Sequence, residues 1–113
     1  KRKNVSRKMK SYIIAETACS HDGSTNRLKK ILSFAIKAGF DALQLQIWRK
    51  EKVVSKDHKD FKILKKVEIK YQDWKKIINH IKRLSKKIDI ICCVYGESSQ
   101  KDTNKLSKEA NGK

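Results

Sequence analysis

Short apolar runs alternate with amphipathic stretches along this chain, and this alternation restricts the fold more than any other feature. The apolar runs at 12–15, 42–47 and 88–94 have the length of buried strands. Helical stretches separate them, so the predicted order is strand, helix, strand, helix, strand, with a faint helical signal after residue 97. Strands connected by helices form right-handed βαβ units in a parallel sheet. The sequence therefore predicts an α/β fold with parallel strands.

The two helical stretches between these runs carry continuous apolar stripes. The first places its apolar residues at helical spacing on one face, namely Leu28, Ile31, Leu32, Ala35 and Ile36. We expect this helix to begin after Ser24 or Thr25, whose hydroxyl can cap a free N–H, and to end at Gly39. The second helix carries a similar stripe, composed of Tyr71, Trp74, Ile77, Ile78, Ile81 and Leu84. A polar connection at 48–59 and a short helix near 60–66 are expected before it.

The length of the chain limits how this pattern can be completed. At 113 residues it allows one domain at most, whereas a (β/α)8 barrel needs roughly 250 residues. Three strands cannot close a barrel, so a small three-layer sandwich and the first part of a larger fold both remain open. Residues 1–11 are basic and lack periodicity, which predicts a flexible lead-in. The first residue is Lys rather than Met, and we expect a piece of a longer chain.

The net charge and the cysteines limit the functional classes to which this chain can belong. Lys and Arg total 29 and Asp and Glu total 12, which gives a net charge of +17. Such a surface attracts nucleic acids or anionic substrates. Along the sequence, however, the aromatic residues do not alternate with lysines as a stacking platform requires, so nucleic acid is not the favoured partner. The three cysteines show no C-x-x-C spacing, which argues against disulfides and indicates a reducing, cytoplasmic compartment. No apolar run reaches the ~18 residues of a membrane span, so no membrane partner is expected.

Polar side chains at the carboxyl ends of the predicted strands form the candidate site. Gln44 and Gln46 share one face of the second strand because strand side chains alternate, and Glu16 ends the first strand. Ligands bind outside the carboxyl ends of parallel strands. The same side chains could instead form hydrogen bonds with loop backbone, and the spacing leaves both interpretations open.

The histidines and cysteines form no recognisable metal-binding motif. His21 is either a solvated loop residue or a ligand near a helix N-terminus, where N–H groups favour anions. Cys92 and Cys93 are adjacent, so they face opposite sides of a strand, and each is by default a small buried hydrophobe. We can assign no base to activate either thiol.

Three segments together resemble the sialic acid synthase family, which includes N-acetylneuraminate and pseudaminate synthases. The first is Tyr12-Ile13-Ile14-Ala15-Glu16 with Ser20-His21-Asp22-Gly23-Ser24, which is similar to the family's opening motif IIAE…NHxG. The second is Ala38-Gly39-Phe40-Asp41-Ala42-Leu43-Gln44-Leu45-Gln46, similar to AGADAVKFQ. The third is Lys65-Lys66-Val67-Glu68-Ile69-Lys70-Tyr71-Gln72-Asp73-Trp74, similar to KKLELSYEDW. The resemblance covers roughly residues 12–96, in order and at the right spacing.

The resemblance implies that residues 12–113 form the first three βα units of a (β/α)8 TIM barrel, an incomplete N-terminal part of a synthase domain. Family members condense phosphoenolpyruvate with an N-acylated mannosamine-type sugar, or its 6-phosphate, and release phosphate. A divalent metal, manganese or magnesium, polarises the sugar aldehyde, and the resemblance places its ligands after residue 113. We expect the chain alone to be inactive and poorly stable, because its sheet would have open edges. A homodimer of the full-length protein stays open.

By position, the resemblance assigns a catalytic role to Glu16 and substrate binding to Gln44, Gln46 and Cys93. Glu16 matches the family's strand-one glutamate, and Gln46 matches the glutamine that hydrogen-bonds the sugar. Gln44 replaces the family's phosphoenolpyruvate-binding lysine, and an amide can donate a hydrogen bond but carries no charge. Cys93 replaces a threonine, and Ser20 replaces an asparagine.

These departures leave several functional hypotheses beside a sialic-acid-synthase-like enzyme. One is a divergent family member with a different sugar, a weakened phosphoenolpyruvate site or no activity. Another is a related barrel that condenses phosphoenolpyruvate with an aldose. A third, from a different class, is a non-catalytic basic module that binds nucleic acid through its lysine-rich faces.

Overall fold

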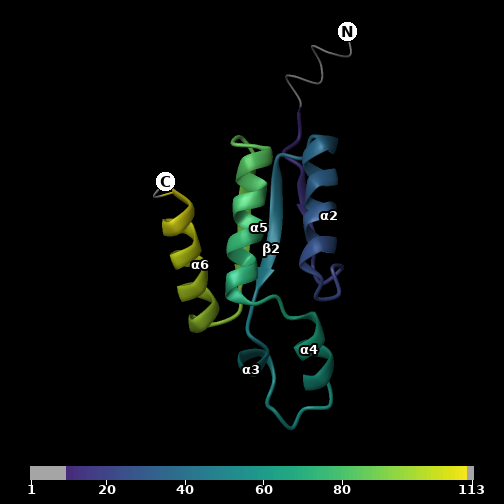
Figure 1. Ribbon diagram of the computed structural model, residues 1–113, viewed down its shortest axis with the longest axis vertical. Coiled ribbons are helices and arrows are strands. Elements are labelled where there is room, and N and C mark those ends of the chain that lie inside the picture. The colour runs from purple at the N-terminus through teal and green to yellow at the C-terminus, as the bar shows by residue number, and fades with distance from the viewer. Residues whose placement is uncertain (1–9, 112–113) are drawn as a thin grey trace.

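The computed structural model describes residues 10–111, and most of the predicted lead-in, residues 1–9, lies outside the described residues. The strands and helices alternate as predicted (Figure 1). In chain order they are β1 (Ile14–Glu16), α2 (Thr25–Ala38), β2 (Ala42–Ile47), α3 (Lys50–Val53), α4 (Phe61–Val67), α5 (Tyr71–Leu84), β3 (Asp89–Val94) and α6 (Glu97–Asn111). The strands form one parallel sheet in the order β1-β2-β3, which confirms the α/β prediction.

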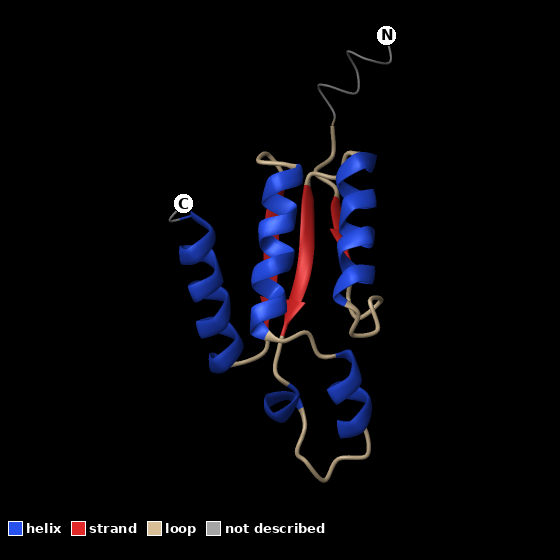
Figure 2. Ribbon diagram, viewed as in Figure 1, coloured by secondary structure: helices blue, strands red, loops and turns tan. Residues whose placement is uncertain are grey.

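One face of this sheet is apolar and is covered by the helices. Side chains alternate along a strand, so Leu43, Leu45 and Ile47 share a face of β2, and all three are buried. They belong to a single core cluster with the buried stripes of α2 and α5 and with Leu106 of α6. Helix α5 lies between α2 and α6 along this face (Figure 2).

The covered face decides between the two architectures that the length left open. A three-layer sandwich needs helices on both faces of its sheet, but the core of residues 10–111 lies on one face only. The other face carries Glu16, Gln44, Gln46 and Cys93. The sandwich is therefore wrong for the described part of the chain, and the single helix layer is the arrangement expected for one sector of a larger α/β fold.

The ends of α2 confirm the capping that the sequence predicts. Ser24 is the N-cap, and its Oγ accepts a hydrogen bond of 3.1 Å from the Arg27 N–H. Gly39 follows the last helical residue with φ 89°, in the left-handed region where a side chain would be strained. These two residues set the length of α2 and so the position at which β2 begins.

The first strand starts two residues later than the apolar run predicts. Ile14 is the first residue of β1 that pairs with β2, where it lies beside Ala42. Tyr12 and Ile13 instead make contacts at the amino end of the sheet. The Tyr12 hydroxyl donates to Asp89 of β3, and the Ile13 N–H donates to the Asp41 carboxylate at 2.8 Å. The strand therefore begins at Ile14, where pairing with β2 begins, and not at residue 12, where the hydrophobic run begins.

The faint helical signal after residue 97 is a regular helix. Leu106 anchors α6 in the core with 2% of its surface exposed. Ser99 is fully buried at the start of α6, where its Oγ accepts from the Tyr95 N–H and donates to the Gly96 carbonyl at 3.3 Å. Arg49, which follows β2, also holds α6 in place, because it donates two hydrogen bonds of 2.9 Å to the Asp102 carboxylate.

Candidate functional site

The register of the sheet brings the four predicted site residues together at its carboxyl end. Glu16 lies beside Gln44, and Gln46 lies beside Cys93. Neighbours in a parallel register point to the same side, and residues two apart on a strand share a face. All four side chains are therefore on the face opposite the helices. Glu16 is exposed, and the other three are half-buried.

This group is polar, and its members come from three neighbouring strands. Glu16 and Cys93 are separated by two strand spacings across the sheet and two residues along it, roughly 12 Å, with the two glutamines between them. The carboxylate accepts hydrogen bonds, and each amide both donates and accepts. Within the three strands only Glu16 and Asp89 are charged, and Asp89 lies at the amino end. The strands themselves therefore supply no positive charge for an anionic ligand.

The two adjacent cysteines lie on opposite faces, as predicted, and differ in their surroundings. Cys92 packs against the core, and burial raises the pKa of its thiol to about 11. Cys93 lies beside Gln46 on the open face. Cys92 thus acts as a small hydrophobe, whereas the position of Cys93 lets it contact a ligand. The assigned substrate-binding role of Cys93 stays a prediction.

The loop that joins β1 to α2, residues 17–24, is fixed at the same end of the sheet. The Thr17 N–H donates to the Gln44 carbonyl oxygen at 3.4 Å, and its Oγ1 donates to the same oxygen at 3.3 Å. The Ser20 Oγ donates to the Thr17 carbonyl at 2.6 Å. These bonds attach the loop to the backbone beside Gln44, so Ser20 has a local structural role.

His21 is buried within this loop, with 2% of its surface exposed, so the prediction of a solvated residue is wrong. Its Nδ1 accepts a hydrogen bond of 2.9 Å from the Gly23 N–H, which leaves the proton on Nε2. Burial lowers its pKa, although the neighbouring Asp22 acts in the opposite direction. A neutral, buried imidazole that bonds its own loop supports a structural role rather than anion binding.

Gly23 lets this loop approach the end of α4. It has φ 82°, and a Cβ at this position would collide with the carbonyl oxygen of Lys66. Ala18 and Asp22 also have positive φ values, of 47° and 53°. A positive φ costs little at a glycine but is costly at Ala18 and Asp22, where it persists only if the surroundings fix it. The contact between this loop and α4 holds the Glu16 side of the site in place.

Tyr95 and Cys19 are site neighbours that the residue pattern did not assign. Burial raises the pKa of Tyr95 first, and Cys93, Cys19 and Glu16 add to the increase, which places these groups near the phenol. Tyr95 follows Cys93 by two positions, so the alternation of side chains could have indicated it. Cys19 lies in the loop after β1, and no periodic pattern relates it to the other strands.

Positive charge lies close to this end of the sheet in a separate cavity. Lys52 of α3 and Lys101 of α6 line a cavity of about 350 Å³ together with Tyr95 and Gly96. Lys101 forms an ion pair of 3.2 Å with Glu97, which also lines the cavity. We call Lys52 and Lys101 the basic rim. Tyr95 lies between this rim and the polar strand ends.

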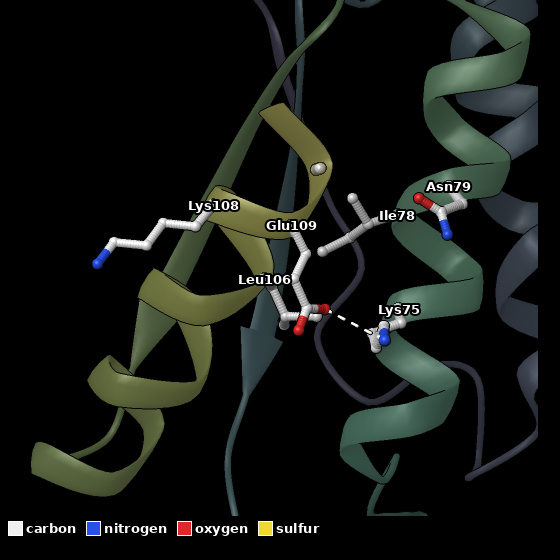
Figure 3. Close-up of a pocket in the computed structure, with 7 residues that line it drawn as sticks. Lys75, Ile78, Asn79, Leu106, Lys108 and Glu109 are labelled. Carbon is white, nitrogen blue, oxygen red and sulfur yellow. Dashed lines mark ion pairs between the residues drawn. The ribbon is translucent and has the colours of Figure 1, made fainter. Parts of the chain in front are cut away.

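Another cavity lies on the helix side of the described residues. It has a volume of about 420 Å³ and is bounded by α5 and α6, with Ile78 and Leu106 among its lining residues (Figure 3). Lys75 and Glu109 form an ion pair of 3.3 Å across it. Its lining residues all come from these two helices, so it contains none of the four predicted site residues.

Metal-binding groups and membrane-spanning helices were sought in residues 10–111, the part of the chain that the structure describes. Within them, no three His, Cys, Asp or Glu side chains are arranged to hold a metal ion. None of the helices in this range is both long and apolar enough to cross a membrane.

Parallel strands, one helix layer and convergent polar residues at the strand ends define the class. This is a parallel α/β unit with polar side chains at the carboxyl ends of its strands, the position at which ligands of parallel α/β folds bind. No protein-family model matches the sequence, and no curated protein matches it.

A solved structure does match the fold. It is the N-acetylneuraminic acid (sialic acid) synthetase of Leptospira borgpetersenii serovar Hardjo-bovis in complex with citrate. The TM-score is 0.74, the sequence identity is 17%, and the match covers 84% of this chain and 33% of that one. The chain thus spans about a third of the synthetase's length and has a sialic acid synthetase-like fold over that part.

Proposed function

We propose that this chain forms the first three βα units of a barrel enzyme that condenses phosphoenolpyruvate with an N-acylmannosamine-type sugar, or its 6-phosphate. The single observation that carries the proposal is the register of the sheet. It pairs Glu16 with Gln44 and Gln46 with Cys93 on the open face at the strand ends. The likeness to the sialic acid synthetase and the sequence motifs support the same assignment.

Each residue then has a role that its chemistry allows. The Glu16 carboxylate accepts hydrogen bonds from sugar hydroxyls and orients the aldehyde carbon toward the enolpyruvate methylene carbon. The Gln46 amide donates to or accepts from the sugar, and the Cys93 thiol contacts the ligand as a weak donor. The Gln44 amide donates to a phosphate or carboxylate oxygen of phosphoenolpyruvate, with the weaker strength of an uncharged donor.

The missing charge at Gln44 is the weakest feature of the site. Lys52 and Lys101 at the basic rim attract an anionic substrate toward the strand ends. They act at longer range than a lysine on the strand would, and the neighbouring Glu97 reduces their effect. We therefore propose that phosphoenolpyruvate binds weakly to the natural sequence.

The family's divalent manganese or magnesium ion does not fit the described residues, since they contain no metal-binding group of their own. We derive no step through it, and its ligands are proposed to lie outside this chain. A homodimer of the full-length protein and a cytoplasmic location are further proposals.

The test is phosphate release from phosphoenolpyruvate by a full-length protein that contains this chain, with divalent metal and N-acetylmannosamine. We expect slow release from the natural sequence and at least about tenfold faster release from Gln44→Lys, because a charged hydrogen bond is roughly twice as strong as a neutral one. Glu16→Gln in the Gln44→Lys background is the matched control and should abolish the gain.

Two of the other hypotheses, the related barrel enzyme and the divergent member, are outcomes of the same assay. Release with an unacylated aldose but not with N-acetylmannosamine would indicate the related barrel enzyme. No release from either the natural sequence or Gln44→Lys would contradict the synthase proposal and favour a divergent inactive member.

A further inference from the structure

The cavity of about 350 Å³ at the basic rim is formed by two neighbouring segments of this chain. Lys52 comes from α3, in the connection that follows β2, whereas Tyr95 and Lys101 come from the segment that follows β3. Both segments lie at the end of the sheet toward which β2 points (Figure 1). We call this space the rim cavity.

The rim cavity does not lie at an open edge of the sheet. Lys105, one turn after Lys101, has its Nζ 5.1 Å from the centre of the Tyr71 ring of α5. Asp102, on the same flank of α6, accepts the two hydrogen bonds from Arg49. This flank therefore faces neighbouring elements of the chain and not the side of β3 that a further strand would occupy. In a (β/α)8 barrel the loops that follow the strands surround the substrate site, so the rim cavity stays on the substrate face of a complete barrel.

The lining of the rim cavity suits a phosphate group. Lys52 and Lys101 supply two ammonium groups. Gly96 and Ser98 lie at the start of α6, where the first N–H groups of a helix have no partner within the helix. The Ser98 Oγ is buried and has no hydrogen-bond partner among residues 10–111, which is costly unless a bound group supplies one. Two cations, helix N–H groups and an unpaired hydroxyl together favour a dianion.

The acidic residue of this lining weakens the site without closing it. Glu97 pairs with Lys101 at 3.2 Å, and the two side chains are 82% and 75% exposed. Such an exposed pair contributes little to stability. A phosphate monoester carries nearly two negative charges at neutral pH and a carboxylate carries one, so phosphate can displace Glu97 from Lys101.

The position of the rim cavity excludes phosphoenolpyruvate bound at Gln44 as the source of this phosphate. Gln44 lies beside Ile91 in the sheet, and Tyr95 follows Ile91 by four residues, or about 13 Å along the strand direction. Phosphoenolpyruvate carries its phosphate and its carboxylate on the same carbon. A molecule held by the Gln44 amide is therefore too short to place its phosphate in the rim cavity.

The acceptor sugar is long enough to reach the rim cavity. An N-acylmannosamine has its aldehyde and its 6-position at opposite ends of its carbon chain. With the aldehyde held between Glu16 and Gln46, a 6-phosphate extends toward Tyr95. The Tyr95 phenol lies near Glu16 and Cys93, and the same residue lines the rim cavity, so the two sites are continuous.

We infer that the rim cavity binds the 6-phosphate of the acceptor, so that the phosphorylated N-acylmannosamine, and not the free sugar, is the substrate. This inference rests on the proposed function, which leaves the phosphorylation of the acceptor open. Lys52 and Lys101 then determine specificity, because they contact only the phosphate group and not the reacting carbon.

The experiment is isothermal titration calorimetry of a full-length protein that contains this chain. The ligands are N-acetylmannosamine 6-phosphate, N-acetylmannosamine and phosphoenolpyruvate. We expect the phosphorylated sugar to bind at least about tenfold more tightly than the free sugar, because charged hydrogen bonds are stronger than neutral ones. Lys52→Gln/Lys101→Gln should remove this difference and leave the affinities for the free sugar and for phosphoenolpyruvate within about twofold of the natural values.

Two variants complete the comparison. Lys86→Gln/Lys87→Gln removes the same net charge just before β3, at the opposite end of the strand from Tyr95, and should change affinity for the phosphorylated sugar by less than about twofold. Glu97→Gln removes the competing carboxylate and should tighten binding of the phosphorylated sugar by about threefold, without an effect on the free sugar.

Three results would overturn the inference. The first is equal affinity of the natural protein for the two sugars. The second is a loss of affinity for phosphoenolpyruvate, instead of the phosphorylated sugar, in Lys52→Gln/Lys101→Gln, which would assign the rim cavity to phosphoenolpyruvate. The third is an equal loss in Lys86→Gln/Lys87→Gln, which would reduce the effect to net charge.

Phosphate release from phosphoenolpyruvate, measured in parallel with each sugar, separates this inference from the proposed function. Release with the free sugar only would overturn the inference and leave the proposed function standing. Tight binding of the phosphorylated sugar that depends on Lys52 and Lys101, without release from either sugar, would contradict the proposed function and support the phosphate site.

Discussion

Leu45 and Gln46 are consecutive residues of β2, yet they lie in opposite environments. Leu45 is fully buried beneath the helices, whereas Gln46 is half-buried on the open face beside Cys93. The same alternation separates the covered face, which holds the chain together, from the open face, which carries the candidate site. The first face is defined by hydrophobic burial and the second by the chemistry of a few polar groups. Variants at neighbouring positions can therefore separate stability from binding.

The largest expected effect is on the covered face. Leu45→Ala should lower the free energy of unfolding by about 3 kcal/mol, since it removes buried methyl groups and leaves a cavity. Gln46→Ala should change it by less than about 0.5 kcal/mol, as is usual for partly exposed polar positions. The measurement is the denaturant midpoint and slope for each chain.

A milder variant keeps this comparison measurable if Leu45→Ala no longer folds. Ile47→Val, at a position that is 2% exposed, should cost about 1 kcal/mol. An equal loss for Gln46→Ala and Ile47→Val would contradict the division into a covered and an open face.

The second-largest expected effect is on the reaction rates of the two adjacent thiols, those of Cys92 and Cys93. In a Cys19→Ser background, a chain that retains only Cys92 should react with a disulfide reagent at about pH 8 at least tenfold more slowly than one that retains only Cys93. The reason is that burial raises the Cys92 pKa to about 11, so few of its thiols are ionised, and the core also blocks the reagent. Stopped-flow absorbance gives the rates, and the same chains in urea should react equally. Similar rates in the folded chains would place both cysteines on accessible surfaces.

The covered face was largely predictable from the sequence because burial leaves a periodic pattern. The stripes containing Leu28 and Leu32 in α2 and Ile77 and Ile81 in α5 are buried as predicted. The errors concern the ends of elements. The run at 12–15 predicted the first strand two residues too early, because pairing with β2, not hydrophobicity, decides where β1 begins. The four-residue helix α3 lies in the predicted polar connection, and it buries no residue that could have produced a pattern.

The site was only partly predictable, because it depends on register as well as on alternation. Alternation places Gln44 and Gln46 on one face without any knowledge of the neighbouring strands. That Glu16 lies beside Gln44 follows from the pairing of β1 with β2, which the local sequence does not determine. The burial of His21 was missed for a similar reason, since it arises from a loop that folds back on itself and bonds through Gly23. The roles of Glu16, Gln44, Gln46 and Cys93 stay predictions.

The smallest expected effect concerns pH and compares two histidines, one at the site loop and one on the helix side. Burial lowers the pKa of His21, and burial together with Lys29 and Arg83 lowers that of His80. Each group binds its proton more readily in the unfolded chain, whose histidine pKa is about 6.5. Stability should therefore be complete above about pH 6.5 and should fall as the pH drops through that value toward the folded pKa values. Protonation of His21 also removes the bond that Nδ1 accepts from the Gly23 N–H.

Urea midpoints at about pH 7.5 and about pH 5.5 measure this loss in the natural sequence and in two variants. His21→Asn retains an acceptor for Gly23, and His80→Gln retains a donor for Ser33, so each should remove part of the pH dependence without a large change at the higher pH. If His80→Gln removes the whole pH dependence of stability, the loop around His21 already opens at neutral pH. The Glu16 side of the site is then less rigid than its hydrogen bonds indicate. If His21→Asn removes the larger share, the loop unfolds together with the core, and the open face is as firmly positioned as the covered one.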